Sequence, residues 1–158
     1  MSVVFAGSSQ KIENNVFVGS DARVPLVAVL GSSGSTFRFN TIVNISPIVG
    51  SAYAVACDEG LDFTSNIIAY NSTSPASCVA RYTLFDAAGA EEVNRGVGNR
   101  SAEVVTFFQD RQAGNFHLTS TSPALGSGEP DLVTTDLDGS ARRMPVGSMP
   151  DVGAYEAP

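Results

Sequence analysis

Apolar and polar positions follow one shared pattern in three segments of the chain, residues 11–18, 36–43 and 62–69. The segments align without gaps, and each carries an asparagine at the same place. These asparagines, Asn15, Asn40 and Asn66, lie 25 and 26 residues apart. Short repeats of this length, with turn residues and no helical periodicity, are typical of solenoids.

Further short apolar runs complete the repeat. One precedes each aligned segment, at residues 3–6, 27–30 and 54–57, and a fainter fourth copy starts at 77 and continues to 85. In a parallel β-helix each repeat forms one coil, and each strand pairs with the same strand of the next coil, about 4.8 Å away. The β-helix explains the shared register, which a β-sandwich does not, and the leucine spacing of leucine-rich repeats is absent.

Stacking the repeats predicts columns of equivalent side chains. Two columns are expected to point inward: Ile12 beside Phe37 and Phe63, and Phe17 beside Ile42 and Ile68. The three asparagines are expected to form a polar ladder, because stacked amides hydrogen-bond to one another. The column of Asn14, Phe39 and Ser65 is mixed, so the pattern is imperfect there.

The rest of the chain is less regular. We expect coils over 1–86, a last coil and a crossing loop over 87–128, and a C-terminal cap over 129–158, all in one domain. Residues 87–103 are interpreted as the crossing loop, while 104–108 and 115–119 are predicted to be strands. Solenoid ends expose backbone and apolar side chains, so a cap is needed. The predicted fold class is therefore all-β, a short parallel β-helix of about three to five coils with a C-terminal cap.

Composition narrows the classes of function. The chain has 158 residues, 43% apolar and 16% charged, with a net charge of −7. An acidic chain without a basic stripe is poorly suited to nucleic acid or to anionic membrane surfaces, and no apolar run is long enough to span a bilayer. The first residues show no signal-peptide pattern. Cys57 and Cys78 fit no metal motif with His117; two buried thiols are favoured over a single disulfide.

The second half of the chain carries a resemblance to a known family. The stretches Gly114-Asn115-Phe116-His117-Leu118, Ser122-Pro123-Ala124-Leu125-Gly126 and Asp151-Val152-Gly153-Ala154-Tyr155-Glu156 resemble the ending of bacterial right-handed parallel β-helix proteins of the pectate-lyase-like superfamily, of the choice-of-anchor Q type. Val105-Thr106 stands where that family often has Asp-Pro. The resemblance implies a right-handed helix and an extracellular or cell-surface location. It also implies that the chain is the C-terminal part, or a short version, of a longer solenoid.

Two groups of residues are candidates for chemistry. Lys11, Glu13, Arg38 and Asp62 fall on one outward face, and the related lyases of acidic sugars use basic residues and a cation on such a face. The alternative is a solvent-exposed ion pair between Glu13 and Arg38 on neighbouring strands.

The tail holds the second group. Asp136, Asp138 and Asp151 offer oxygen ligands that suit Ca²⁺. The favoured interpretation is that they and Arg142 and Arg143 fix the cap by charge-assisted hydrogen bonds, with no cofactor. The lone His117 is expected to point to solvent.

The sequence favours a non-catalytic β-helix module, structural or carbohydrate-binding, with a polysaccharide as the expected partner. One alternative is a small polysaccharide lyase or glycoside hydrolase. Another is an assembly module that forms homo-oligomers through its open N-terminal coil.

Overall fold

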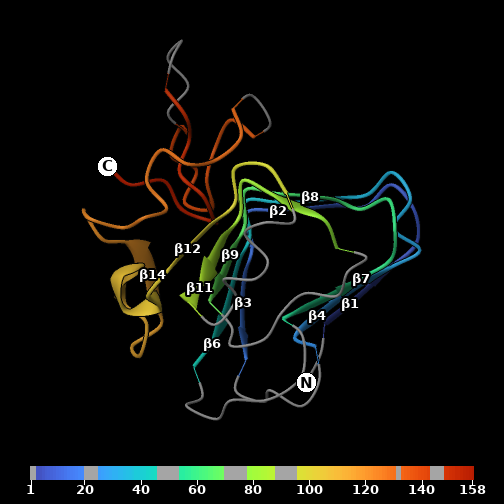
Figure 1. Cartoon of the computed structure of the whole chain (residues 1–158), viewed down its shortest axis with the longest axis horizontal. Helices are drawn as coiled ribbons and strands as arrows, with labels where there is room; N and C mark the ends of the chain where they lie inside the picture. The colour runs from blue at the N-terminus through green and yellow to red at the C-terminus, as the bar shows by residue number, and fades with distance from the viewer. Residues whose placement is uncertain are drawn as a thin grey trace.

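The computed structural model describes residues 3–19, 25–45, 54–69, 78–87, 96–130, 133–142 and 148–158. These residues form an all-β structure whose main feature is three parallel sheets (Figure 1). We number the repeats by their described ranges: repeat 1 is 3–19, repeat 2 is 25–45, repeat 3 is 54–69, repeat 4 is 78–87 and repeat 5 is 96–102. No helix in this part of the chain is long and apolar enough to cross a lipid bilayer.

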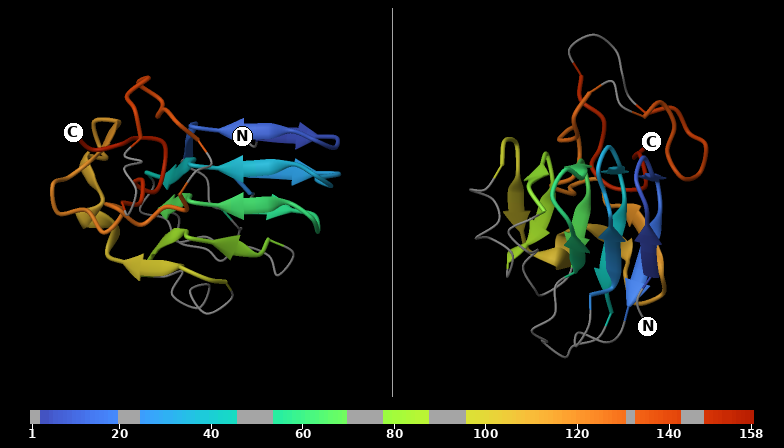
Figure 2. Two further views of the ribbon diagram at one scale, coloured as in Figure 1. Left: turned by 90° about the horizontal axis from the view of Figure 1, so that it is seen from above. Right: turned by 90° about the vertical axis from the view of Figure 1, so that its right-hand side faces the viewer.

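Each of repeats 1 to 3 gives one strand to each sheet, in the same order. The first sheet contains β1 (Val3–Ala6), β4 (Val27–Leu30) and β7 (Val55–Cys57). The second contains β2 (Lys11–Glu13), β5 (Thr36–Arg38), β8 (Asp62–Thr64) and β10 (Ala80–Arg81). The third contains β3 (Val16–Gly19), β6 (Thr41–Asn44), β9 (Ile67–Ala69), β11 (Leu84–Asp86) and β12 (Arg100–Ala102). Figure 2 shows successive repeats side by side in chain order, an arrangement compatible with the predicted β-solenoid.

The predicted register is confirmed. Ile12 pairs with Phe37 and Phe37 with Phe63, while Phe17 pairs with Ile42 and Ile42 with Ile68. Both columns belong to one core between the three sheets, where the rings of Phe37 and Phe63 stack 5.2 Å apart. The fourth copy extends the columns, since Phe85 pairs with Ile68. Burial of these columns removes apolar surface from water and is the main stabilisation of the repeats.

The mixed column has a backbone explanation. Asn14, Phe39 and Ser65, together with Tyr82 of repeat 4, have positive φ angles of 55°, 51°, 57° and 45°. Each lies at the corner where the second sheet ends and the third begins. The corner requires a left-handed conformation, which costs a non-glycine residue energy whatever its polarity. This position is therefore set by geometry, which is why its side chains share no pattern of polarity.

The asparagine ladder follows this corner. Asn40 Oδ1 accepts from the backbone N–H and the Nδ2 of Asn15, both at 3.0 Å, and Asn66 Oδ1 accepts from the same two groups of Asn40 at 2.9 and 3.2 Å. Thr83 takes the ladder position in repeat 4, and its N–H donates to Asn99 Oδ1 of repeat 5 at 3.0 Å. These bonds join repeats 1 to 3 and, separately, repeats 4 and 5, and they satisfy polar groups that would be costly to bury unpaired.

The residues after repeat 5, 103–158, which we call the C-terminal segment, pack in their described part on the outer face of the third sheet. Val43, Ile67 and Leu84 project from that face into a second core with Phe107, Phe116 and Val152. Figure 1 shows the C-terminal segment beside this sheet. The central strands of the third sheet, β6, β9 and β11, are therefore buried on both faces, which the sequence interpretation did not include.

Local predictions for this segment were partly wrong. The expected strand at 104–108 begins with the 3-10 turn η2 (Val104–Thr106), and β13 (Phe108–Asp110) then pairs antiparallel with β14 (Asn115–Leu118). The turn is explained by hydrogen bonds from the N–H groups of Thr106 and Phe107 back to the carbonyls of Glu103 and Val104. Strand β14 agrees with the prediction for 115–119. Of the crossing loop expected at 87–103, residues 88–95 lie outside the described residues, and residues 100–102 form strand β12 instead of loop, because they pair with β11.

The residues predicted to form the cap contact repeats 1 to 3 from the side. Asn14 Nδ2 donates to the carbonyl of Thr135 at 2.8 Å, and the N–H of Ala154 donates to Thr41 Oγ1 at 2.9 Å. The N–H of Gly153 donates to the carbonyl of Ser65, also at 2.9 Å. A single segment therefore joins three repeats.

The expectation of two free thiols was wrong, because Cys57 and Cys78 form a disulfide. Cys57 ends β7 with its side chain in the inner core, and Cys78 enters the same core at the start of repeat 4, with the two Cα atoms 5.6 Å apart. That separation is ordinary for a disulfide. The bond ties repeat 3 to repeat 4.

Candidate functional site

Charged side chains form a ladder on the outward face of the second sheet. Three of them belong to the sheet and Glu129 lies beside it. We define this charged ladder as Arg38, Asp62, Arg81 and Glu129. Arg38 pairs with the Asp62 carboxylate, and Arg81 Nη2 lies 2.8 Å from Asp62 Oδ1. Arg81 Nη1 lies 3.2 Å from Glu129 Oε1. The charges alternate in sign, so each member of the charged ladder has an opposite neighbour.

Glu129 reaches this face from the C-terminal segment. Its Oε2 accepts from Thr64 Oγ1 at 2.9 Å, and its N–H donates to Ser65 Oγ at 2.8 Å. The charged ladder therefore also attaches that segment to repeat 3.

Electrostatics favour the charged forms of two members of the charged ladder, Asp62 and Arg81. Partial burial raises the pKa of Asp62, but hydrogen bonds and attraction from Arg38 and Arg81 outweigh it, and the net pKa is lowered. The hydrogen bond to Asp62 raises the pKa of Arg81, against the opposite effect of burial. A carboxylate that holds its charge is a poor general acid at neutral pH, and an arginine that holds its proton is a poor base.

The structure places all four sequence-predicted residues on this face but joins only two of them. Arg38 and Asp62 are paired, whereas Glu13 accepts a hydrogen bond from Thr36 Oγ1 at 3.4 Å and Lys11 is exposed. Arg38 therefore pairs with Asp62 on the next strand, and not with Glu13 on the preceding strand as expected. Sequence reasoning missed Arg81 and Glu129 as members. Arg81 was detectable from the fourth repeat, where it pairs with Thr64, but Glu129 had no sequence signal.

The acids proposed for calcium are each engaged in hydrogen bonds within the protein. Asp136 accepts from the N–H of Ser140 at 2.7 Å and of Glu156 at 2.9 Å. Asp151 accepts from the N–H of Gly126 at 2.7 Å and of Ala157 at 2.8 Å. Among the described ranges, no group of three His, Cys, Asp or Glu side chains is arranged to hold a metal ion.

The third acid, Asp138, pairs with His117. His117 Nε2 lies 2.8 Å from Asp138 Oδ2, and its Nδ1 lies 2.8 Å from Asn115 Oδ1. The imidazole also lies against Tyr155, with ring centroids 4.2 Å apart. His117 was expected to point to solvent, and 44% of its side chain is exposed, while Asn115, Asp138 and Tyr155 hold the ring. Burial and the nearby Asp138 and Asp136 raise the pKa of Tyr155.

Arg142 is a buried cation in the described part of the C-terminal segment. Its Nη2 donates to Asn14 Oδ1 and to the carbonyl of Gly153, both at 2.8 Å, and its Nη1 lies 3.4 Å from Glu156 Oε2. The guanidinium lies 4.2 Å from the centroid of the Phe39 ring. Burial lowers the pKa of Arg142, and the carboxylates of Glu156, Asp136 and Asp151 oppose that effect. The role predicted for Arg143 lies outside the described residues.

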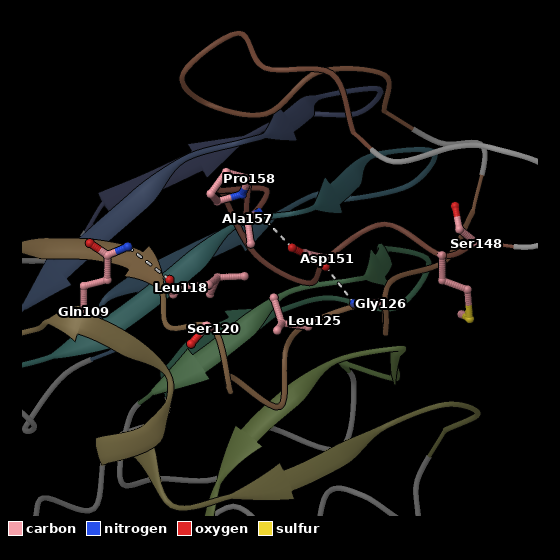
Figure 3. Close-up of a pocket in the computed structure, with 10 residues that line it drawn as sticks. Gln109, Leu118, Ser120, Leu125, Gly126, Ser148, Asp151, Ala157 and Pro158 are labelled. Carbon is pink, nitrogen blue, oxygen red and sulfur yellow. Dashed lines mark hydrogen bonds between the residues drawn. The ribbon is translucent and has the colours of Figure 1, made fainter.

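A pocket of about 520 Å³ opens in the C-terminal segment (Figure 3). Leu118, Leu125 and Met149 supply apolar surface, and Gln109 and Ser120 supply polar groups at its sides. The Asp151 carboxylate at the pocket is already engaged by two backbone N–H groups. Mixed linings of this kind suit a small neutral ligand with hydroxyl groups. The pocket was not predicted, because its residues are spread from 109 to 158.

Comparison with known proteins identifies no relative of this chain. No protein-family model, curated protein or solved structure matches the chain. The resemblance to the pectate-lyase-like superfamily therefore rests on the sequence motifs alone.

Proposed function

We propose that the chain is a right-handed parallel β-helix module with a non-catalytic, structural role. The observation that supports this proposal is the charged ladder. It lies on the face where the resembled lyases keep their catalytic groups, and its central charges are paired with one another. A catalytic site needs groups that exchange protons or contact substrate near neutral pH. In this chain, Arg38, Asp62 and Arg81 instead connect three adjacent strands.

The repeat geometry supports the β-helix. Strands from each repeat enter the three parallel sheets in the same order and pair with the equivalent strands of the next repeat. The asparagine ladder and the inner core are continuous along this direction. The right-handed sense of the helix and the C-terminal cap are proposed from the family resemblance.

We propose an extracellular or cell-surface location. The family resemblance implies this location, and the Cys57–Cys78 disulfide supports it, because such bonds persist in oxidising compartments and are rare in the cytosol. Mass measurement of the natural protein with and without reducing alkylation tests the point. A fully alkylated chain without prior reduction contradicts the extracellular proposal.

An activity screen tests the structural role. The chain is incubated with uronate-containing and neutral polysaccharides, and new reducing ends and unsaturated products are measured. No turnover is expected. Turnover that is abolished by Arg38→Ala, with the fold intact by circular dichroism, would establish the alternative of a small polysaccharide lyase or hydrolase.

Carbohydrate binding is a second candidate function, favoured by the pocket in Figure 3. Its apolar and polar walls suit the apolar C–H face and the hydroxyl groups of a neutral sugar ring, and a polysaccharide is the proposed partner. Titration calorimetry against neutral oligosaccharides tests it. Ser120→Trp is expected to fill the pocket and abolish binding, whereas Thr121→Trp, on an exposed neighbour that does not line the pocket, is the matched control. Equal binding by both variants refutes this assignment.

A further inference from the structure

Both ring nitrogens of His117 face oxygen atoms. Nδ1 lies 2.8 Å from Asn115 Oδ1, and Nε2 lies 2.8 Å from Asp138 Oδ2. A neutral imidazole carries one N–H and one bare nitrogen, which can only accept a hydrogen bond. Either neutral form would therefore set a nitrogen lone pair against an oxygen at one of the two contacts. The imidazolium, which carries two N–H groups, satisfies both contacts.

The orientation of the Asn115 amide does not depend on the imidazole. The backbone N–H of His117, which can only donate, points to Asn115 Oδ1 at 3.2 Å. On the other side of the amide, Asn115 Nδ2 donates to Gln109 Oε1 at 3.3 Å, and Gln109 Nε2 donates to the carbonyl of Leu118 at 3.2 Å. Rotation of the Asn115 amide by half a turn would set donor against donor at the first of these contacts. His117 Nδ1 therefore meets an acceptor.

The contact with Asp138 joins β14 to an exposed loop. Asp138 belongs to the loop of residues 136–140, which is closed by an antiparallel bridge between Thr135 and Ala141. The tip of this loop is exposed to solvent. The pair of His117 with Asp138 also forms part of the wall of a hollow of about 400 Å³ beside the loop. A change in this one pair can therefore alter how the loop lies on β14.

The other ionisable side chains around the imidazole have ordinary partners. Those on the elements packed against it are Asp136, Asp138, Arg142, Tyr155 and Glu156 in the residues after 135, and Asp110 and Arg111 at the end of β13. Burial and the carboxylates of Asp138 and Asp136 raise the pKa of Tyr155, so its hydroxyl stays neutral up to high pH. Histidine is the side chain that ordinarily changes charge between about pH 5 and 8. His117 is the one histidine of the chain.

We propose that His117 and Asp138 form a pH-sensitive latch, which holds the 136–140 loop against β14 while the imidazole carries two N–H groups. Loss of one proton leaves a bare nitrogen facing an oxygen. The contact with Asn115 lies within β14, whereas the contact with Asp138 joins two separate elements, so the latter opens. Because protonation favours the closed loop, the latch holds at the acidic end of the histidine range and releases as the pH rises. This proposal is independent of the structural role and of the carbohydrate pocket.

Hydrogen exchange of the loop amides measures the latch. The N–H of Leu137 donates to the carbonyl of Ala154 at 2.9 Å, that of Gly139 to the carbonyl of Asp136 at 3.2 Å, and that of Ser140 to the Asp136 carboxylate at 2.7 Å. Exchange of these amides is measured at about pH 5 and about pH 8. The rates are corrected for the intrinsic effect of pH on amide exchange. Protection should be about two- to fivefold lower at the higher pH, the range for loss of an exposed ion pair.

Two variants separate the latch from a general effect of pH. Asp138→Asn replaces the carboxylate by an amide of the same shape, whose NH₂ group can donate to a bare imidazole nitrogen. Its loop protection should therefore be equal at the two pH values. Glu103→Gln makes the same change at an exposed carboxylate outside the loop and should keep the pH dependence of the natural chain.

Nitrogen NMR of the imidazole reads the protonation state without any substitution. Both ring nitrogens of His117 should carry a proton at about pH 5, and one should lose it by about pH 8. The latch is overturned if corrected loop protection in the natural chain is equal at the two pH values while the imidazole changes its protonation. It is also overturned if the pH dependence survives in Asp138→Asn. Neither result affects the polysaccharide screen or the calorimetry described above.

Discussion

Replacing Arg142 by methionine should release the C-terminal segment from the repeats. The substitution removes the hydrogen bonds to Asn14 and Gly153, the ion pair with Glu156 and the contact with the Phe39 ring. The Glu156 carboxylate would stay buried without its cation. Removal of one partner of a buried ion pair typically costs about 3–5 kcal/mol.

Thermal and urea unfolding followed by circular dichroism measure this loss. For a domain of this size, 1 kcal/mol corresponds to about 2–4 °C in Tm, so Arg142→Met should lower Tm by about 6–20 °C. Arg100→Met, at an exposed position on β12, is the matched control and should change stability by less than about 0.5 kcal/mol. Adding Glu156→Gln to Arg142→Met should recover part of the loss, because the buried charge is then removed.

The reasoning would be refuted if Arg142→Met lost less than about 1 kcal/mol, since surface substitutions lie in that range. It would also be refuted if the double variant were as unstable as the sum of the two single variants. Limited proteolysis locates the effect: cleavage should appear first in the C-terminal segment, and first cleavage within repeats 1 to 3 would contradict the role of Arg142 in docking that segment.

Three other results are expected. Because the pKa of Asp62 is lowered from 3.8 in the folded chain, its ion pairs stabilise the protein above that pH and lose their effect as the pH falls through the folded value. Urea midpoints measured down to pH 3 should therefore fall more steeply for the natural chain than for Asp62→Asn. Equal slopes for the two proteins would contradict this expectation. Replacing both Cys57 and Cys78 by alanine should cost about 3 kcal/mol, and a Tm unaffected by reductant in the natural chain would argue against the bond. Asn40→Ala should cost at least about 2 kcal/mol in urea unfolding because it leaves buried partners of the ladder unpaired, and a cost below that of an exposed substitution would show that the ladder contributes little.

The register of the repeats was predictable because it is local information repeated along the chain. The spacing of Asn15, Asn40 and Asn66 aligned the strands correctly, and the inward columns followed from that alignment. The left-handed corner was visible only as a disagreement at Phe39, since a large apolar residue gives no sign of a positive φ angle.

The sequence contains a signal for burial of strand β9 on both faces, which the repeat pattern alone does not include. Residues 67–69, Ile-Ile-Ala, are apolar without alternation, as expected for a strand covered on both sides. What covers the outer face could not be predicted, because Phe107, Phe116 and Val152 come from distant parts of the chain.

Part of the candidate site was also predictable from the sequence and part was not. Arg38 and Asp62 were placed on one face by the repeat, whereas their extension to Glu129 depends on where an irregular segment returns. Arg142 contacts Asn14 across 128 residues, and no sequence pattern encodes that distance. Pairing of the cysteines likewise depended on the position of Cys78 in the core beside Cys57, which the sequence did not indicate.

The lateral attachment of the C-terminal segment has a consequence for how the chain unfolds. Stacked repeats contact only their neighbours, so they often unfold one repeat at a time from an end. Here one segment holds Asn14 of repeat 1, Thr41 of repeat 2 and Ser65 of repeat 3 together. Opening repeat 1 therefore also breaks contacts made by a segment that repeats 2 and 3 help to hold. The attachment links repeats that would otherwise open separately and makes their unfolding a shared, cooperative event.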